Sequence, residues 1–295
     1  MATLGRAVIN MLNRWLAKFN LSIDTLTAAQ KEDRRLVEAV RRNDFETAIY
    51  PIPESFRKAQ LGGILSELRN YRDRFESFRD PTLNDVEFGY ENGFFTSPDA
   101  EILYTFVRRQ RPNRILEVGC GNSSKIIRQA IIDGDFKCRH TCVDPQPRSD
   151  VLRLADTVLR VPIESLKPQE LAHQLREGDI LFIDTSHEVK PANDVAYLYG
   201  RLLPCLSNGV VVHIHDIFLP YEYPITWVRD QQLAWGEQYL VQMMLMGSTR
   251  WEVLWPGYYL QRTLNGFSSH FPNMQSGFAQ SFWLSKSDEK LAPHE

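Results

Sequence analysis

Two glycines follow a short apolar run near the middle of the chain, and an acidic residue lies within that run. The run Arg114–Val118 contains Glu117 and is followed at once by Gly119 and Gly121. Glycines at the end of a strand permit a tight turn and let a ligand approach the backbone closely. The next apolar run ends in Asp144, where a carboxylate can accept both hydroxyl groups of a ribose. A glycine turn and an acid at two neighbouring strand ends predict a site for an adenosine cofactor.

The residues around the turn distinguish between adenosine cofactors. A dinucleotide turn requires Gly or Ala three residues after its second glycine, and Ser124 occupies that position here. Glu117 would repel a pyrophosphate, but its charge can help to hold a cationic amino-acid cofactor. We expect Ser123 or Ser124 to cap the helix that follows. An NAD-type oxidoreductase is therefore disfavoured, although it stays an alternative.

Two later apolar runs end in groups that can transfer protons or bind metals. Asp184 ends the first run and His187 follows three residues later, while the second run contains His213 and ends in His215 and Asp216. The carboxyl ends of parallel strands meet at one edge of a sheet, so these side chains should lie near the cofactor. Histidine titrates at about pH 6.5, which makes His187 a candidate general base. His213 lies deeper on the same strand face as His215, and we expect it to be a hydrogen-bonded core residue.

Alternating apolar runs and helical patterns occupy the chain from about residue 96. Strands are expected at 114–118, 139–143, 157–160, 180–184 and 209–215, and helices at about 123–132, 168–176 and 191–203. Continuous apolar strands separated by helices predict a parallel sheet covered on both faces. One long helix is then expected over 229–245, followed by aromatic strands at 251–255 and 280–285 with no helix between them. These two strands predict an antiparallel hairpin at the sheet edge.

The N-terminal residues have a different pattern. We predict a helical cap or lid over 1–95, a catalytic domain over 96–288 and a frayed tail over 289–295. Within residues 4–19, apolar side chains recur at helical spacing opposite Arg6, Asn10, Arg14 and Lys18. Such a helix could lie on a membrane, but packing on its own domain or on a sister subunit is more frequent. A homodimer through the N-terminal helices is therefore one expected assembly.

The composition argues against several classes of protein. The chain has 295 residues, 43% of them hydrophobic and 24% charged, as is ordinary for a soluble globular protein. A net charge of −3 gives no electrostatic case for nucleic acid. No apolar run approaches the length of a membrane span. Four cysteines in a chain without an export signal predict reduced thiols and a cytoplasmic location.

Taken together, these motifs resemble those of the class I S-adenosylmethionine-dependent methyltransferases. "EVGCGNSS" is similar to their first motif, "CVDP" to their second and "QSFWLS" to their reversed last strand, and the resemblance covers about residues 96–286. It implies an α/β fold with a Rossmann-like seven-stranded sheet, parallel except for the reversed last strand and flanked by helices. It also implies that S-adenosylmethionine is held by Glu117, Gly119, Gly121, Asn122, Ser123, Asp144, Pro145 and Asp184.

The resemblance is closest to the small-molecule branch near the catechol-type O-methyltransferases, whose fourth strand ends in an Asp-x-x-His pattern. Carried over by position, the metal ligands of these relatives become Asp184, His215 and Asp216. Histidine in place of an oxygen ligand shifts the preferred ion from Mg towards Mn, Fe or another transition metal. His187 stands where these relatives have a basic lysine. It is therefore either the general base beside Asp184 or a fourth metal ligand.

The resulting prediction is an S-adenosylmethionine-dependent methyltransferase that acts at oxygen on a small or medium organic acceptor. Carbon or nitrogen methylation, a metal-dependent hydrolase suggested by "HIHD", and a non-catalytic S-adenosylmethionine-binding scaffold stay as alternatives. The lack of basic character and the predicted lid point towards natural product biosynthesis. Aromatic residues that could contact the acceptor are Tyr90, Phe94, Phe95, Tyr221, Tyr223 and Trp227.

Overall fold

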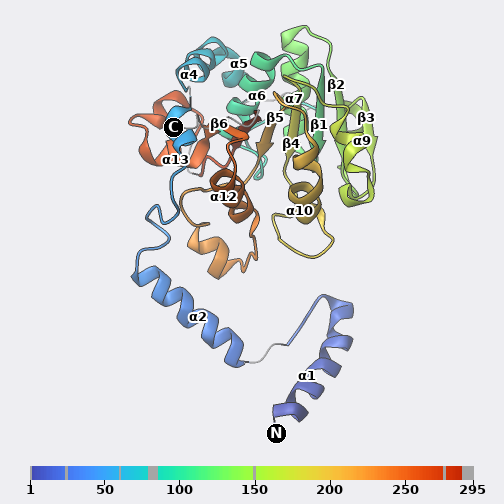
Figure 1. Cartoon of the computed structure of the whole chain (residues 1–295), viewed down its shortest axis with the longest axis vertical. Coiled ribbons are helices and arrows are strands. Elements are labelled where there is room, and N and C mark those ends of the chain that lie inside the picture. Colours follow the sequence, from blue (N-terminus) through green and yellow to red (C-terminus); the bar gives the residue numbers. More distant parts are fainter. Residues whose placement is uncertain are drawn as a thin grey trace, which may run out of the picture. The chain divides into compact units, whose positions relative to one another are not determined.

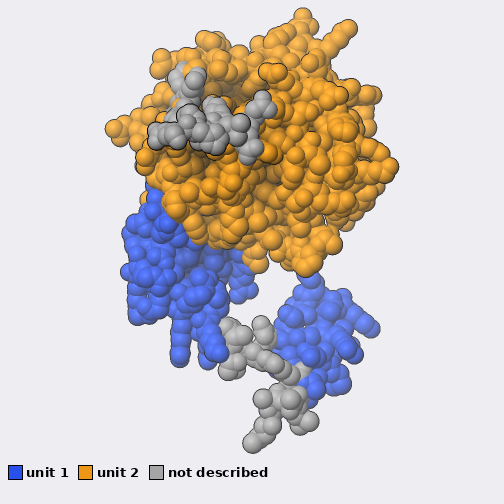
Figure 2. Space-filling view, viewed as in Figure 1, with its two compact units in different colours: residues 1–49, 221–233 blue, residues 50–220, 234–295 orange. Residues whose placement is uncertain are grey.

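The computed structural model of the chain describes residues 2–23, 26–59, 61–78, 86–148, 151–274 and 277–287. The chain divides into two compact units, one made of residues 1–49 and 221–233 and the other of residues 50–220 and 234–295 (Figure 2). This division falls at residue 49 rather than 95, and the functional separation of a cap from a catalytic domain stays a prediction. The frayed tail predicted over 289–295 lies outside the described residues.

The larger unit contains a seven-stranded sheet of order β3-β2-β1-β4-β5-β7-β6 (Figure 1). Strands β1 to β5 pair in parallel, and β7 pairs antiparallel with both β5 and β6. The predicted Rossmann-like sheet with a reversed last strand is confirmed. The strands are β1 (Arg114–Val118), β2 (Arg139–Val143), β3 (Thr157–Leu159), β4 (Ile180–Ile183), β5 (Val211–Ile214), β6 (Trp251–Pro256) and β7 (Phe282–Lys286).

Helices flank this sheet and also form most of the N-terminal region. None in the described part of the chain combines the length and apolar character that a membrane crossing requires. The α-helices are α1 (Ala2–Leu16), α2 (Leu26–Arg41), α3 (Glu54–Lys58), α4 (Leu61–Asn70), α5 (Arg72–Ser77), α6 (Asp99–Gln110), α7 (Asn122–Gly134), α8 (Val151–Leu154), α9 (Pro168–Ala172), α10 (Asp194–Tyr197), α11 (Leu203–Cys205), α12 (Glu237–Gly247) and α13 (Gly257–Thr263). Short 3-10 or π turns are η1 (Ala17–Phe19), η2 (Ile163–Ser165), η3 (Leu198–Leu202), η4 (Thr226–Asp230) and η5 (Phe267–His270).

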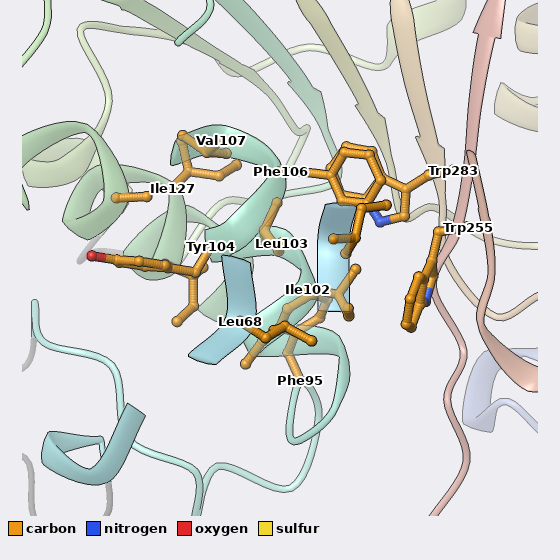
Figure 3. Packing of buried hydrophobic residues seen from close by; sticks show 14 of the residues in the cluster. Leu68, Phe95, Ile102, Leu103, Tyr104, Phe106, Val107, Ile127, Trp255 and Trp283 are labelled. Atoms are coloured by element: carbon orange, nitrogen blue, oxygen red, sulfur yellow. The ribbon is translucent and has the colours of Figure 1, made fainter. Parts of the chain in front are cut away.

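Both faces of the sheet are buried, which explains the continuous apolar strands. In β4, Phe182 belongs to one hydrophobic cluster and its neighbours Leu181 and Ile183 belong to another. Because successive side chains of a strand point to opposite faces, the two clusters lie on the two sides of the sheet. Figure 3 shows the first cluster, where Phe106 of α6 stacks on Trp283 of β7 with ring centroids 4.0 Å apart.

The prediction of one long helix over 229–245 is wrong. Residues 231–236 are not helical, and α12 begins only at Glu237, after Gly236. Glycine is a poor helix former, and Trp235 instead forms an isolated antiparallel bridge with Glu188. This break sets the start of α12 beside the loop that follows β4.

The prediction that no helix separates the last two strands is also wrong. The helix α13 and the turn η5 lie between β6 and β7, although the two strands still pair as expected. With seven residues, α13 spans too few turns to give a periodic pattern. Leu260 and Phe267 from this segment are buried in the first cluster, so the insertion extends the core.

Candidate functional site

The turn after β1 depends on Gly119. Its φ is +79°, and a Cβ atom there would lie 1.7 Å from the carbonyl oxygen of Asp184. Gly121 is different, because its backbone is extended and an added Cβ would have no atom within 4 Å. The fold therefore requires glycine at position 119, whereas glycine at position 121 leaves open space in front of α7.

The two glycines should respond differently to substitution. Gly119→Ala forces a Cβ into the β4 backbone at a left-handed φ, and we expect it to lower the free energy of unfolding by about 3 kcal/mol or more. Gly121→Ala should unfold at nearly the wild-type urea concentration, because its Cβ meets no atom. Urea unfolding followed by circular dichroism compares the two variants. Equal losses of stability would contradict this account of the turn.

Glu117 lies beneath the turn and is fully buried. The hydroxyl groups of Ser123 and Ser124 donate hydrogen bonds to its carboxylate at 2.6 and 2.8 Å, and Nε2 of His140 lies 2.7 Å away. The expectation that a serine caps α7 is wrong: the N-cap is Gly121, with no side-chain cap hydrogen bond. The two serines instead connect the first turn of α7 to β1, and His140 connects β1 to β2.

The pair Glu117–His140 predicts a pH-dependent stability. Burial alone lowers the pKa of His140, but hydrogen bonds to Cys142 and to the Glu117 carboxylate outweigh it and raise the pKa to about 10. In the unfolded chain the pKa of a histidine is about 6.5. The stabilisation of the fold by protonated His140 is therefore fully present below that pH and is lost as the pH rises towards 10.

We therefore expect wild-type stability to fall by a few kcal/mol, on the order of 3, between about pH 6.5 and about pH 9.5. His140→Gln should be less stable than wild type at pH 6.5, and its stability should change much less between the two pH values. Urea unfolding of both proteins at the two pH values measures the difference. An unchanged slope in the variant would assign the pH dependence to other groups.

A cavity of about 480 Å³ opens at the carboxyl ends of β1, β2 and β4. Among the predicted cofactor residues, Gly119, Asp144, Pro145 and Asp184 line it. The remaining predicted cofactor residues are not part of its lining: Glu117, Gly121, Asn122 and Ser123. Of these, Glu117 has its carboxylate enclosed by other side chains, so its place in the structure supports a role in shaping the turn.

Asp144 lines this cavity and accepts hydrogen bonds from two backbone N–H groups. One of its carboxylate oxygens accepts the backbone N–H of Cys120 at 3.0 Å, and the other accepts that of Gln146 at 2.7 Å. Each carboxylate oxygen has two lone-pair directions, so both retain capacity for a further donor. The residue lies at the end of β2, as the sequence predicted, and faces the cavity.

The predicted catalytic and metal residues meet beside the same cavity. Nε2 of His187 lies 3.3 Å from Oδ1 of Asp184 and 3.1 Å from Oδ2 of Asp216. Nδ1 of His215 lies 3.4 Å from Oδ1 of Asp216 and 3.9 Å from Oδ1 of Asp184. Asp184 is the most open of the four, with a side chain that is 33% exposed, while the others are nearly buried. The cluster therefore reaches solvent through Asp184.

Glu237 holds His187 from the side opposite to Asp184. Nδ1 of His187 hydrogen-bonds to Oε2 of Glu237 at 2.8 Å, and the Glu237 side chain is fully buried. The backbone N–H groups of Gly236 and Glu237 donate to the His187 carbonyl at 2.8 and 3.2 Å, and the His187 φ is +58°. The ring of Trp235 lies 4.5 Å from that of His187. Glu237 is therefore part of the site.

Two further residues of the cluster were missed by the sequence analysis. The Asp99 carboxylate accepts the backbone N–H groups of Gln280 and Ser281 and lies 3.7 Å from Nε2 of His215. Nε2 of Gln280 donates a hydrogen bond to Asp216. Asp99 precedes β1 and Gln280 precedes β7, so neither follows a parallel strand end and neither gives the signal that identified the others.

The charges of the cluster shift its pKa values in opposite directions. Burial lowers the pKa of His187, but hydrogen bonds to Asp184, Asp216 and Glu237 outweigh it and raise the pKa well above the usual value. For His215, burial is likewise outweighed by the nearby Asp216 and Asp184 carboxylates, which raise its pKa. Burial opposes ionisation of Asp216, yet the two imidazoles lower its pKa.

His213, by contrast, belongs to the core. It is fully buried, stacks on Phe182 with centroids 4.1 Å apart, and hydrogen-bonds to the hydroxyl of Ser281 at 3.1 Å. Burial and the nearby His215 lower its pKa well below the usual value. The prediction of a hydrogen-bonded core histidine is confirmed.

The cluster has the donors and the charge that suit a divalent cation. Asp184, His187 and Asp216 offer ligand atoms that all lie within 4.8 Å of one another, and His215 borders them. Four carboxyl groups (those of Asp99, Asp184, Asp216 and Glu237) face two imidazoles, so acidic groups outnumber basic ones in the cluster. Two carboxylates with one or two imidazoles favour Mn or Fe over Mg.

The part of the chain that contains the glycine turn and the strand-end cluster is similar to a known protein family. A family model described as a methyltransferase domain matches residues 116–217. The match runs from β1 to just beyond β5 and includes the glycine turn, Asp144 and the strand-end cluster up to Asp216. The resemblance to class I methyltransferases is confirmed for this part of the chain. A search of curated protein sequences finds no match.

The solved structures that match the chain include two that are described as methyltransferases. The SAH-bound methyltransferase PaMTH1 of Podospora anserina is 13% identical over 91% of this chain and 99% of its own, with a TM-score of 0.40. An O-methyltransferase of Bacillus cereus in complex with SAH is 14% identical over 76% of this chain and 91% of its own, with a TM-score of 0.41. Identities and scores this low assign no activity to this chain.

Proposed function

We propose that this chain, whose residues 116–217 match a methyltransferase domain, transfers a methyl group from S-adenosylmethionine to an oxygen atom of a small or medium organic acceptor. The observation that carries the proposal is the position of Asp184. Its side chain lines the 480 Å³ cavity and also lies 3.3 Å from Nε2 of His187. The predicted cofactor space and the acid–base cluster therefore share a residue, as a reaction between cofactor and acceptor requires.

The cofactor is assigned to the cavity on chemical grounds. Gly119 and Asp144 line the cavity, and Asp144 offers a carboxylate to the two hydroxyl groups of the ribose. The sulfonium cation would be favoured by the acidic lining, which includes Glu164 and Asp184. A cofactor bound in this cavity would lie beside Asp184 and the cluster.

Methyl transfer from a sulfonium is a displacement, so the protein must align acceptor, methyl and sulfur and remove a proton from a hydroxyl acceptor. In its neutral form, which a nearby cation would favour by lowering the raised pKa, His187 would accept that proton through Nε2, the nitrogen that faces Asp184 and Asp216. Glu237 fixes the ring by its hydrogen bond to Nδ1. The second catalytic group, Asp184, would orient the acceptor hydroxyl.

Asp184, Asp216 and His215 would hold a divalent metal, and His187 would join them as a ligand only in place of its role as general base, because both roles use Nε2. Such an ion, when bound, supplies positive charge that orients an acceptor hydroxyl and lowers its pKa. Without a bound ion, the charged side chains of these residues would interact with the acceptor directly. We propose Mn or Fe rather than Mg because one or two of the donors are imidazoles.

The acceptor class and the location are proposed from the composition of the chain. We assign the chain to natural product biosynthesis in the cytoplasm, supported by its near-neutral charge and by four cysteines that are all free. Of the aromatic residues expected to contact the acceptor, Phe95 packs on His215 with ring centroids 5.1 Å apart, and Phe94 is 71% exposed.

Glu237→Gln should reduce turnover without affecting cofactor binding. The substitution keeps the shape of the side chain but removes the charge that orients His187, and we expect a loss of about 10- to 100-fold in kcat. Glu252→Gln, on the exposed edge of β6, is the control. A wild-type rate in Glu237→Gln would remove Glu237 from the catalytic arrangement.

The proposed function is tested by incubating the protein with labelled S-adenosylmethionine and a panel of phenols, catechols, carboxylic acids and amines, with and without Mn²⁺ or Fe²⁺. Mass spectrometry and NMR of the product identify the methylated atom. Transfer to oxygen is expected. Transfer only to nitrogen or carbon would change the acceptor class, and cofactor binding without turnover would favour a scaffold. Metal-dependent ester hydrolysis without cofactor binding would favour a hydrolase.

A further inference from the structure

The N-terminal helix α1 exposes an unusual amount of apolar surface. Together with the turn η1 it presents Met11, Trp15 and Phe19 at 67%, 60% and 62% exposure, with Val8 and Leu12 at 49% and 39%. Their spacing of three, four, seven and eight residues places them on one face of a helix. Single exposed apolar residues are ordinary, but a continuous stripe with two aromatic rings marks an interaction surface.

The charges of this segment are all of one sign. Residues 2–23 contain Arg6, Arg14 and Lys18 and no acidic residue, although the chain as a whole has a net charge of −3. At 100° per residue Arg14 lies about 110° from the centre of the apolar stripe, and Lys18 borders the stripe next to Met11. Arg14 and Lys18 are exposed. Cations beside a stripe that contains Trp and Phe fit a helix that lies in a membrane interface, because long basic side chains can extend from the edge of the stripe to the headgroups.

We propose that α1 binds the surface of an anionic lipid bilayer, lying in the plane of the interface with Met11, Trp15 and Phe19 in the acyl boundary. Trp15 and Phe19 form an edge-on pair with centroids 5.5 Å apart, which gives one compact aromatic anchor. Tryptophan prefers this boundary because its ring is apolar and its N–H remains able to bond. Arg14 and Lys18, beside the stripe, would extend to the negative headgroups.

Charge favours a bilayer over a second copy of the same helix. Two copies of α1 packed through their stripes would bring cations together, with no carboxylate in residues 2–23 to pair with them. An anionic leaflet supplies that missing charge across its whole surface. With three cations and no lipid anchor, the binding should be reversible and sensitive to salt. The sequence-based expectation of a homodimer through this helix is thus the competing outcome.

This inference does not rest on the proposed methyl transfer, and its test does not use activity. The full-length protein is floated or sedimented with vesicles of phosphatidylcholine alone and of phosphatidylcholine with phosphatidylglycerol. We expect binding to the anionic vesicles only, and a loss when NaCl is raised from about 0.1 M to about 1 M, where the Debye length falls from about 10 Å to about 3 Å. Met11→Glu with Trp15→Glu should reduce the bound fraction about tenfold or more.

A matched control lies on α2, where Val37 and Val40 are each 48% exposed. Val37→Glu with Val40→Glu adds the same charge to another exposed helix and should leave vesicle binding unchanged. Circular dichroism confirms that both variants fold. The proposal fails if the wild-type protein ignores anionic vesicles or if both double variants lose binding equally. It also fails if light scattering shows that the wild-type protein and the α2 variant are dimers while the variant with Met11→Glu and Trp15→Glu is a monomer.

Discussion

Asp184→Asn is expected to lower the rate of methyl transfer by about 1,000-fold, the combined effect of losing one metal ligand and the group beside the general base. The residue joins the cavity to the cluster, since it lines the former and lies within 4 Å of both His187 and His215. Asparagine keeps the size of the side chain and removes its charge. The backbone carbonyl that packs against Gly119 is unchanged, so the turn should keep its shape.

Cofactor affinity distinguishes a chemical role of Asp184 from a structural one. We expect Asp184→Asn to bind S-adenosylmethionine within about threefold of wild type, because only one of several cavity groups is altered. Glu164→Gln is the matched control, since Glu164 lines the same cavity but lies outside the cluster. Steady-state kinetics and calorimetric titration of both variants provide the comparison. A rate in Asp184→Asn similar to that of Glu164→Gln would place the chemistry elsewhere.

The second large effect is expected at Asp144. Asp144→Ala removes the carboxylate assigned to the two ribose hydroxyls, and two hydrogen bonds to a charged acceptor correspond to about 100-fold in the dissociation constant. The substitution also removes the acceptor for the N–H groups of Cys120 and Gln146, so some loss of stability will accompany it.

Asp156→Ala controls for that structural loss. Asp156 likewise accepts a backbone N–H, that of His140 at 2.8 Å, and is not part of the cavity lining. It should reduce stability modestly and leave the dissociation constant for S-adenosylmethionine unchanged. If Asp144→Ala binds the cofactor as tightly as Asp156→Ala does, Asp144 does not hold the ribose.

The sheet could be predicted because its strands are short apolar runs with clear ends. Asp144 and Asp184 each come directly after a strand, and Glu117 lies one residue before the end of β1, so their places near the carboxyl edge follow from the order of the strands. Residues 231–236 could not be predicted in the same way. Their helical pattern is overridden by the bridge between Trp235 and Glu188, a contact between segments far apart in the sequence.

The same reasoning explains which site residues were found. His187, His215 and Asp216 lie at the ends of adjacent parallel strands, and parallel pairing of β4 and β5 brings them together. Asp99 and Glu237 are the first residues of α6 and α12. Acidic residues are common in the first turn of any helix, where most are exposed to solvent, so their positions alone do not mark a site. Burial and a hydrogen-bond partner identify them, and neither property can be read from one sequence.

The most direct test of the central claim is calorimetric titration of S-adenosylmethionine, and separately of NAD, into the purified wild-type protein, with a metal analysis of the same sample. The account predicts one site per chain for S-adenosylmethionine with a dissociation constant on the order of micromolar, and no binding of NAD. Binding of NAD alone, or of neither ligand, would contradict it.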